Sequence, residues 1–268
     1  RNKIMTTTKM LTTANFIESE SISRLNFNQD ECQKLRTLGK ESSIPSDLVR
    51  TQAKDWFNQS VERINNNTYS ELCKIMINNK CNKPTAHNYT QLYDLILSPY
   101  INKPMNFIEI VLGTNNQDVP SHMSASYAVG SSLRGWREYF NWKDQYINGA
   151  DVDPRVLFQE PGIQTHYLDQ TNPVSISTCY QKFGFLETGI DCILDDGLHE
   201  FHSNITLLLC SWQYLNRGGI YMIEDISKGT FDSIINMIKK MALDADYAGF
   251  ELPSALKSDN RVIVLQKR

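Results

Sequence analysis

The sequence lacks several features that define common classes of protein. Among its 268 residues are six cysteines, but no two have the close Cys-x-x-Cys spacing of a zinc or redox site. The apolar runs are too short to span a membrane, and residues 1–8 lack the apolar core of a signal peptide. A net charge of −3 gives no basic surface for nucleic acid or anionic membranes. We therefore expect a reduced, cytoplasmic protein with no nucleic-acid partner and no membrane partner.

Glycine is scarce where a nicotinamide or flavin protein needs it. Residues 106–116 contain an acid-bearing apolar run and then a loop with a single glycine, Gly113, and the next glycine is Gly130. The usual dinucleotide fingerprint requires three spaced glycines in one such loop. A nicotinamide or flavin cofactor is therefore disfavoured.

Residues 1–85 differ from the rest of the chain. They are polar and contain one glycine, Gly39, and the sequence starts with Arg1 instead of Met, which suggests a fragment of a longer protein. Apolar residues at helical spacing predict a helix over 47–64, with Ser46 or Asp47 as its N-cap. Thr68 and Glu71 form a capping-box pattern ahead of a second helix. We expect a helical N-terminal region that covers the substrate or forms an oligomer interface, followed by a second domain over residues 86–268.

The second domain shows alternating strand-like and helix-like segments. Strand-like apolar runs occupy residues 107–112, 146–150, 165–168, 192–194, 220–223, 249–252 and 262–265, and helical spacing occurs over 131–140, 203–215 and 231–243. This alternation predicts βαβ units and a mostly parallel sheet. No helix is expected between the last two runs, which predicts a closing antiparallel pair. The expected fold class is α/β: a mostly parallel seven-stranded sheet with helices on both faces, plus the N-terminal helical appendage.

Acidic side chains follow two of these runs at the point where each expected strand ends. Asp195 and Asp196 come after residues 192–194, with His199 close behind, and Glu224 and Asp225 come after residues 220–223. The carboxyl ends of parallel strands meet at one rim, where open α/β sheets bind ligands. These side chains should therefore share one cleft, which is enough for a divalent-metal site with a base beside it.

The ordered motifs resemble those of a known family. Five motifs look like those of class I S-adenosylmethionine-dependent methyltransferases. They are residues 107–113 (Phe-Ile-Glu-Ile-x-x-Gly), 149–151 (Gly-Ala-Asp), 168–170 (Leu-Asp-Gln), 193–199 (Ile-Leu-Asp-Asp-Gly-x-His) and 218–225 (Gly-Gly-Ile-Tyr-x-Ile-Glu-Asp). They are most similar to the metal-dependent sugar O-methyltransferases of macrolide biosynthesis, of the macrocin and mycinamicin type. The resemblance covers roughly residues 83–226, implies a Rossmann-like fold and suggests a homo-oligomer.

The resemblance implies roles for individual cofactor-binding residues. The methionine side of S-adenosylmethionine would be lined by Glu109, Gly113 and Thr114, with Asp195 nearby. Arg134 matches a position close to the cofactor carboxylate. Asp151 would hold the ribose hydroxyls, and Asp169 and Gln170 would face the adenine.

A metal site is expected from the residues and from the resemblance. Carboxylates of Asp196, Glu224 and Asp225 suit Mg²⁺ (or Mn²⁺), which prefers oxygen ligands. In the family, the positions of Asp196 and Asp225 bind the metal; Glu224 and Asp118 are further candidate ligands. His199 is the expected catalytic base, because the unperturbed pKa of histidine lies near the working pH.

The expected activity is transfer of a methyl group to a hydroxyl of a sugar, on a nucleotide sugar, a glycan or a glycosylated small molecule. Two alternatives stay open: a catechol or other diol O-methyltransferase, and a non-catalytic cofactor-binding subunit of an assembly. The acids also have simpler interpretations as helix caps or solvated strand ends, His199 and His202 as surface histidines, and His87 as a helix-start residue or part of the acceptor pocket. The expected site would be absent only if the simpler interpretations of the acids and of His199 were all true at once.

Overall fold

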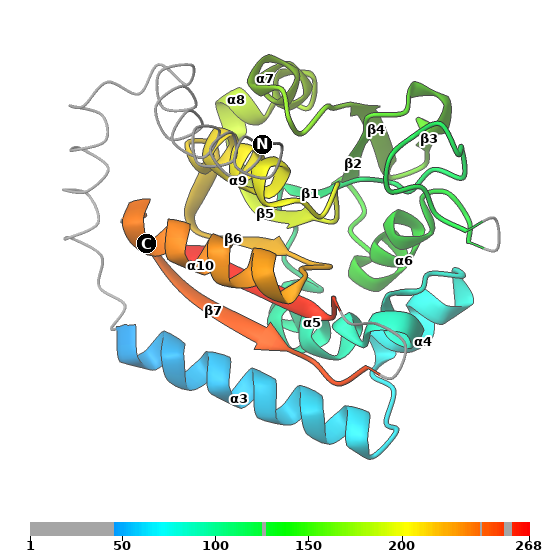
Figure 1. Ribbon diagram of the computed structural model, residues 1–268. Helices are drawn as coiled ribbons and strands as arrows, with labels where there is room; N and C mark the ends of the chain where they lie inside the picture. Colours follow the sequence, from blue (N-terminus) through cyan, green and yellow to red (C-terminus); the bar gives the residue numbers. More distant parts are fainter. Residues whose placement is uncertain (1–45, 125–126, 242, 255–258) are drawn as a thin grey trace, which may run out of the picture.

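The computed structural model describes residues 46–124, 127–241, 243–254 and 259–268. Its centre is an eight-stranded sheet with the order β3-β4-β2-β1-β5-β6-β8-β7 (Figure 1). The strands are β1 Phe107–Ile110, β2 Ile147–Asp151, β3 Gln159–Glu160, β4 Ile163–Tyr167, β5 Ile190–Asp195, β6 Leu215–Ile223, β7 Ala245–Glu251 and β8 Arg261–Lys267. All seven expected runs overlap a strand, which confirms the α/β prediction; the additional strand is the two-residue β3 at one edge.

Strand directions follow the expected pattern. The pairs β4–β2, β2–β1, β1–β5 and β5–β6 are parallel. Strand β8 is antiparallel to both of its neighbours, β6 and β7. The antiparallel closing pair is therefore confirmed, and the carboxyl ends of five parallel strands lie along one rim of the sheet.

Helices occur on both faces of the sheet. They are α3 Ser46–Asn65, α4 Glu71–Asn78, the π-helix η2 Lys83–His87, α5 Tyr89–Leu97, η3 Ser98–Tyr100, α6 Ser131–Phe140, η4 Pro154–Val156, α7 Pro173–Lys182, α8 Phe185–Thr188, α9 Phe201–Trp212 and α10 Lys228–Met241. None of the helices in the described part of the chain is both long and apolar enough to cross a membrane.

The structure differs from the expected helices at the start of one helix and by an additional helix. Helix α4 is capped by Ser70, whose hydroxyl accepts a hydrogen bond from the Cys73 N–H at 3.3 Å, while the Thr68 hydroxyl contacts the carbonyl of Asn66. Helix α7 was not expected, because its apolar spacing is weak. It begins with Pro173 at its first position, and the Asn172 side chain caps it.

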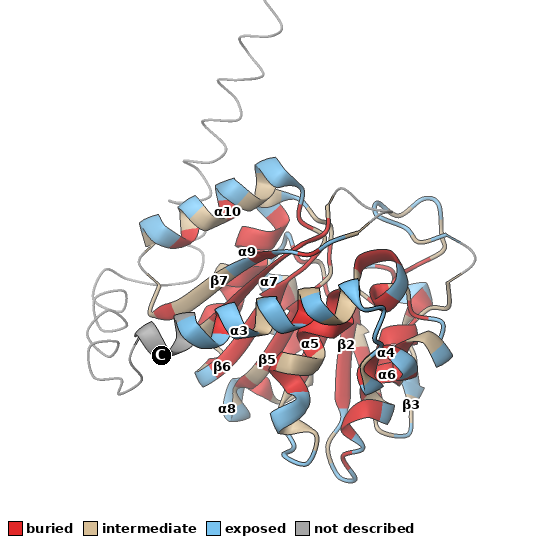
Figure 2. Ribbon diagram, turned by 90° about the horizontal axis from the view of Figure 1, so that it is seen from below, coloured by how far each residue is buried: buried red, intermediate tan, exposed pale blue. Residues whose placement is uncertain are grey.

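Side chains of each strand alternate between two hydrophobic cores. Phe107 packs in the core under α3, α4, α5 and α6, whereas Ile108 and Ile110 pack in the core under α7, α9 and α10. The central strands β1, β2 and β5 are buried, while α3 and α10 expose their outer faces (Figure 2). Alternation therefore turns Glu109 toward the α5–α6 layer, on the same side as Phe107.

The described N-terminal helices share the core of the sheet domain. Ala53, Leu72 and Met76 pack in one cluster with Trp136 of α6. Helices α4 and α6 approach closely at Gly135, where an added Cβ would lie 2.4 Å from Sδ of Met76. The division at residue 85 and the roles expected for residues 1–85 stay predictions, and residues 1–45 lie outside the described part of the chain.

Candidate active site

Three residues with unusual backbone conformations mark the rim of the sheet. Val111, His199 and Asp225 follow β1, β5 and β6, and their φ angles are +85°, +59° and +55°. A positive φ is costly for most side chains and especially for a β-branched one such as Val111. Strained backbone of this kind concentrates at functional sites. All three residues line the same cavity.

Two adjoining cavities lie at this rim. The larger, of about 330 Å³, is lined by residues including Gly113, Asp196, His199, Glu224 and Asp225. The smaller, of about 200 Å³, is lined by residues that include Thr114, Asp151, Asp169 and Gln170. Val111, Ser121 and Gly197 line both cavities, so the two form one elongated site.

In the larger cavity, two of the three expected metal ligands, Asp196 and Asp225, form a group with the expected base His199. Ligand atoms of Asp196, His199 and Asp225 all lie within 4.8 Å of one another. His199 Nε2 is 3.3 Å from Asp196 Oδ1 and 3.7 Å from Asp225 Oδ2. Two carboxylates at the ends of neighbouring strands suit a hard divalent cation such as Mg²⁺, which completes its shell with water or substrate oxygens. The residues present therefore fit the expected metal.

The electrostatics of this group depend on its close charges. Burial lowers the pKa of His199, but the hydrogen bond and charge of Asp196 and the charge of Asp225 raise it to about 8. Burial raises the pKa of Asp196, but the Lys83 ammonium and His199 outweigh this effect and hold that pKa below its ordinary value. Asp196 is therefore a carboxylate at neutral pH.

Lys83 contributes a buried cation that sequence reasoning missed. Its Nζ lies 2.7 Å from Asp196 Oδ2 and 3.2 Å from Glu109 Oε1, and it also contacts Glu224 Oε1. The lysine is 3% exposed. Burial lowers the pKa of the Lys83 amine, but these three carboxylates, Asp196 first, outweigh burial and raise the pKa well above its ordinary value. Lys83 therefore stays protonated among the acids.

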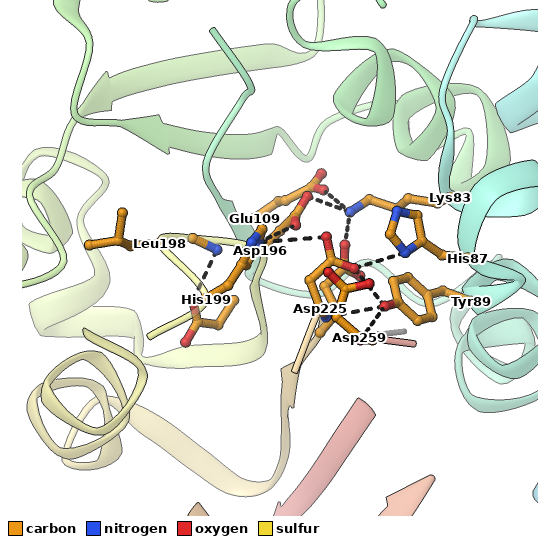
Figure 3. A network of polar contacts seen from close by, with 12 residues as sticks. Lys83, His87, Tyr89, Glu109, Asp196, Leu198, His199, Asp225 and Asp259 are labelled. Carbon is orange, nitrogen blue, oxygen red and sulfur yellow. Dashed lines mark hydrogen bonds and ion pairs between the residues drawn. The ribbon is translucent and has the colours of Figure 1, made fainter. Parts of the chain in front are cut away.

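Aromatic and histidine side chains from η2 and α5 hold the two acids after β6. Asp225 Oδ1 accepts a hydrogen bond from the Tyr89 hydroxyl at 2.5 Å and lies 2.9 Å from His87 Nδ1. The Tyr93 hydroxyl donates to Glu224 Oε2. Figure 3 shows Lys83, His87 and Tyr89 approaching the acids from the side opposite His199. Of the two interpretations for His87, the structure shows the pocket position: its ring is buried and lines the larger cavity.

Two of the residues considered as metal ligands lie outside the metal-binding group. Glu224 lines the cavity, but Lys83 and Tyr93 engage its carboxylate, and burial raises its pKa. Asp118 is largely exposed and pairs with Arg155 at 2.9 Å on the loop after β1. Asp118 therefore lies outside the group formed by Asp196, His199 and Asp225.

The smaller cavity gathers the residues expected around the ribose and adenine. Asp151 accepts a hydrogen bond from the Leu112 N–H at 2.9 Å, which ties the end of β2 to the loop after β1. Burial raises the pKa of Asp151. Gln170 accepts from the Leu198 N–H at 2.7 Å. Asp169 caps its own turn by accepting from the Thr171 N–H.

Three expected cofactor residues do not line either cavity. Glu109 is fully buried, accepts a hydrogen bond from Trp136 Nε1 at 3.0 Å and contacts Lys83; burial raises its pKa. Asp195 faces the α9 layer, accepts from Asn204 Nδ2 at 3.0 Å and has its pKa raised to about 6 by burial.

Arg134 is the third expected residue outside the cavities. Its guanidinium is bound by Glu160 of β3, with an Nη2–Oε1 distance of 2.6 Å, and it lies over the ring of Phe158. The structure therefore does not bring Arg134 to the place expected for the cofactor carboxylate.

Sequence reasoning assigned no role to Lys83, Tyr89 or Tyr93, although residues 87–94 resemble a stretch of the macrocin-type sugar O-methyltransferases. Lys83 stands in a polar stretch that resembles a helix end, and the two tyrosines have the spacing of ordinary core residues in α5. One usable sign is the spacing of Lys83, His87 and the helix start at Tyr89, which places polar groups on a single short segment.

Comparisons with known proteins agree with this architecture. The chain is 30% identical over 140 residues to the 8-demethyl-8-alpha-L-rhamnosyl tetracenomycin-C 2'-O-methyltransferase of Streptomyces olivaceus. The matched segment covers 52% of this chain and 33% of that protein. It is 26% identical over 142 residues to the demethylmacrocin O-methyltransferase of Streptomyces fradiae, covering 53% and 32%. No protein-family model matches the chain. The chain spans about a third of the length of these curated relatives.

A solved structure extends the comparison to the fold. The MycE methyltransferase of the mycinamycin biosynthetic pathway, in complex with Mg, SAH and mycinamycin VI, superposes with a TM-score of 0.56 at 22% identity. The match covers 74% of this chain and 54% of that one. The chain therefore has the Rossmann-like fold of a class I methyltransferase, and about half of its sequence is similar to sugar O-methyltransferases.

Proposed function

We propose that this chain transfers a methyl group from S-adenosylmethionine to a hydroxyl of a sugar, with Mg²⁺ (or Mn²⁺) as the metal. The sugar belongs to a nucleotide sugar, a glycan or a glycosylated small molecule. The observation that carries this proposal is the group Asp196, His199 and Asp225 in a cavity that adjoins a second, nucleoside-sized cavity. The similarity to sugar O-methyltransferases supports it.

The smaller cavity suits the adenosine part of the methyl donor. Asp151 at the end of β2 is placed to accept hydrogen bonds from ribose hydroxyls, as acids at this position do in related folds. Asp169 and Gln170 would face the adenine. Gly113 lines the larger cavity, where the methionine part would lie. S-adenosylmethionine supplies an electrophilic methyl group on its sulfonium.

Asp196 and Asp225 would hold the metal in the larger cavity. A bound Mg²⁺ supplies Lewis acidity, which lowers the pKa of a coordinated hydroxyl. His199 Nε2 faces both carboxylates and is the atom that we assign as proton acceptor. Asp196 Oδ1 would accept a hydrogen bond from Nε2 once this nitrogen carries the proton, which stabilises the protonated imidazole. The acceptor hydroxyl thus loses its proton to His199 as its oxygen bonds to the methyl carbon and the carbon–sulfur bond of the sulfonium breaks, which leaves S-adenosylhomocysteine.

Calorimetry with S-adenosylmethionine, with and without Mg²⁺, tests the first part of the proposal. We expect micromolar binding of the methyl donor and a separate Mg²⁺ heat that disappears in Asp196→Ala. A panel of glycosides, nucleotide sugars and catechols then tests the acceptor by mass spectrometry. Failure of S-adenosylmethionine to bind under either condition would refute the proposed function, and methylation of catechols alone would replace the sugar by another diol.

A further inference from the structure

Lys83 reaches the acids from a segment that is anchored to the loop after β7. Residues Lys83–His87 form the π-helix η2 between α4 and α5. The Ala86 carbonyl accepts a hydrogen bond from the Ser254 hydroxyl at 2.8 Å, and Asn88 donates to the carbonyl of Pro253. The amine of Lys83 is therefore held by the packing of its own segment.

The Lys83 amine lies between carboxylates from three different strand ends. Glu109 belongs to β1, Asp196 follows β5 and Glu224 follows β6. Removing an ammonium group from water costs several kcal/mol unless charge partners surround it. With 3% of Lys83 exposed, these carboxylates make it a permanent internal cation.

Carboxylate oxygens around this cation are divided between two sides. Asp196 directs Oδ2 to Lys83 and Oδ1 to His199. Asp225 directs Oδ1 to His87 and Tyr89, and its Oδ2 faces His199. The two oxygens on the His199 side are thus the ones not engaged by η2 or α5.

Glu224 has no such divided arrangement. Its Oε1 contacts Lys83 and its Oε2 accepts from Tyr93, so both oxygens are engaged on the side away from His199. Among the described residues, Glu224 is absent from the group whose ligand atoms lie within 4.8 Å of one another.

We propose that Lys83 is a positioning residue, an internal cation that holds Glu224 away from the metal site and leaves Asp196 and Asp225 as the acids that would hold a divalent ion. This inference rests on the proposed function, because it concerns the metal of the same site. Glu224 is then a counter-ion of Lys83 and not a metal ligand. The positive charge of Lys83 also weakens the affinity of the site for the divalent ion, because two positive charges close together repel each other.

Binding of Mn²⁺ alone, measured by electron paramagnetic resonance of the free ion, tests this arrangement without methyl donor or acceptor. We expect Glu224→Gln to change the Mn²⁺ dissociation constant by less than about threefold, whereas Asp225→Asn should weaken binding by about 30-fold or more. These two variants are matched, since each replaces one acid of the same pair by its amide and leaves Lys83 in place.

Variants of Lys83 test the role of its charge. Lys83→Met should tighten Mn²⁺ binding by about tenfold or more, because this variant removes a positive charge beside Asp196 and releases Glu224. In the double variant Lys83→Met/Glu224→Gln no carboxylate is released toward the ion, so the tightening should be smaller than in Lys83→Met alone. Lys83→Arg, which keeps the charge, should bind Mn²⁺ as the wild type does.

Several outcomes would overturn the inference. One is a loss of Mn²⁺ binding in Glu224→Gln as large as that in Asp225→Asn, which would make Glu224 a ligand. A folded Lys83→Met variant with unchanged Mn²⁺ affinity would refute the effect of the Lys83 charge. A wild type that binds no Mn²⁺ would refute the metal site itself. If Lys83→Met fails to fold, the Glu224→Gln and Asp225→Asn pair decides alone. S-adenosylmethionine binding is measured separately, so these failures are distinct from failure of the proposed function.

Discussion

Replacing His199 with asparagine isolates the proton acceptor from the rest of the site. The φ angle of His199 is +59°, a left-handed conformation that asparagine adopts more readily than most residues. Asparagine also remains polar but has no basic nitrogen. The variant should keep the loop after β5 in place while it removes the group that accepts the proton.

The size of the effect follows from the surroundings of His199. A positioned general base contributes about 10²–10⁴-fold to a rate. The His199 side chain is 27% exposed, so water can reach the site and partly replace the base. We therefore expect the lower part of this range, a fall in kcat of about 10²–10³-fold, which corresponds to about 2.7–4.1 kcal/mol.

Stability and cofactor binding should change little in the same variant. The substitution removes a partly exposed ion pair of 3.3 Å between His199 and Asp196, and such pairs contribute up to about 1 kcal/mol. The free energy of unfolding, from urea denaturation, should fall by no more than about that amount. Affinity for S-adenosylmethionine should stay within about threefold, because the residues proposed to hold its adenosine part line the smaller cavity, which His199 does not line. These residues are Asp151, Asp169 and Gln170.

The assay is steady-state methyl transfer with S-adenosylmethionine, Mg²⁺ and the acceptor found in the panel. His202→Asn is the matched control, since His202 is exposed at the start of α9, three residues along the chain. It should leave kcat unchanged. A kcat for His199→Asn within about fivefold of the wild type, in folded and metal-loaded protein, would refute His199 as the base.

Three further substitutions test other parts of the site and the fold. Asp151→Asn should weaken S-adenosylmethionine binding by about tenfold or more, since charged hydrogen bonds contribute about 1.5–3 kcal/mol; unchanged calorimetric affinity would contradict the ribose role. Arg134→Ala should leave that affinity within about threefold, because Glu160 holds the guanidinium; a tenfold loss would place Arg134 at the cofactor after all. Gly149→Ala should lower the free energy of unfolding by about 1–3 kcal/mol, because its Cβ would lie 2.4 Å from Leu133 Cδ1; urea denaturation indistinguishable from wild type would show that α6 gives way.

The expected positions and directions of the strands depended on the pattern of neighbouring residues, and the structure confirms them. The seven apolar runs of three to six residues each overlap a strand, and the absence of a helix before β8 correctly indicated an antiparallel closing pair. Placement of Asp196, His199 and Asp225 together followed from the rule that parallel strands end at one rim. Cys192 and Cys210 are buried, as residues in a strand and in a helix facing the core should be.

Expectations about individual side chains succeeded less often, because a motif gives a position and not a direction. Arg134 lies in the expected helix, yet Glu160 on the unforeseen strand β3 turns it away from the cavities. Asp118 lies in the expected loop, but Arg155 binds it. In both cases an opposite charge brought close by the fold decided the orientation.

The sequence by itself determined the α/β architecture and the rim at which the acids gather, because strand periodicity and the direction of parallel strands depend on neighbouring residues. Only the tertiary structure decided which oxygen of each acid is free. Lys83 is 113 residues from Asp196 and 141 from Glu224 along the chain, and it meets them only when η2 packs against the sheet. A buried charge must find its counter-charges wherever the fold places them, so this part of the site could not be derived from local pattern.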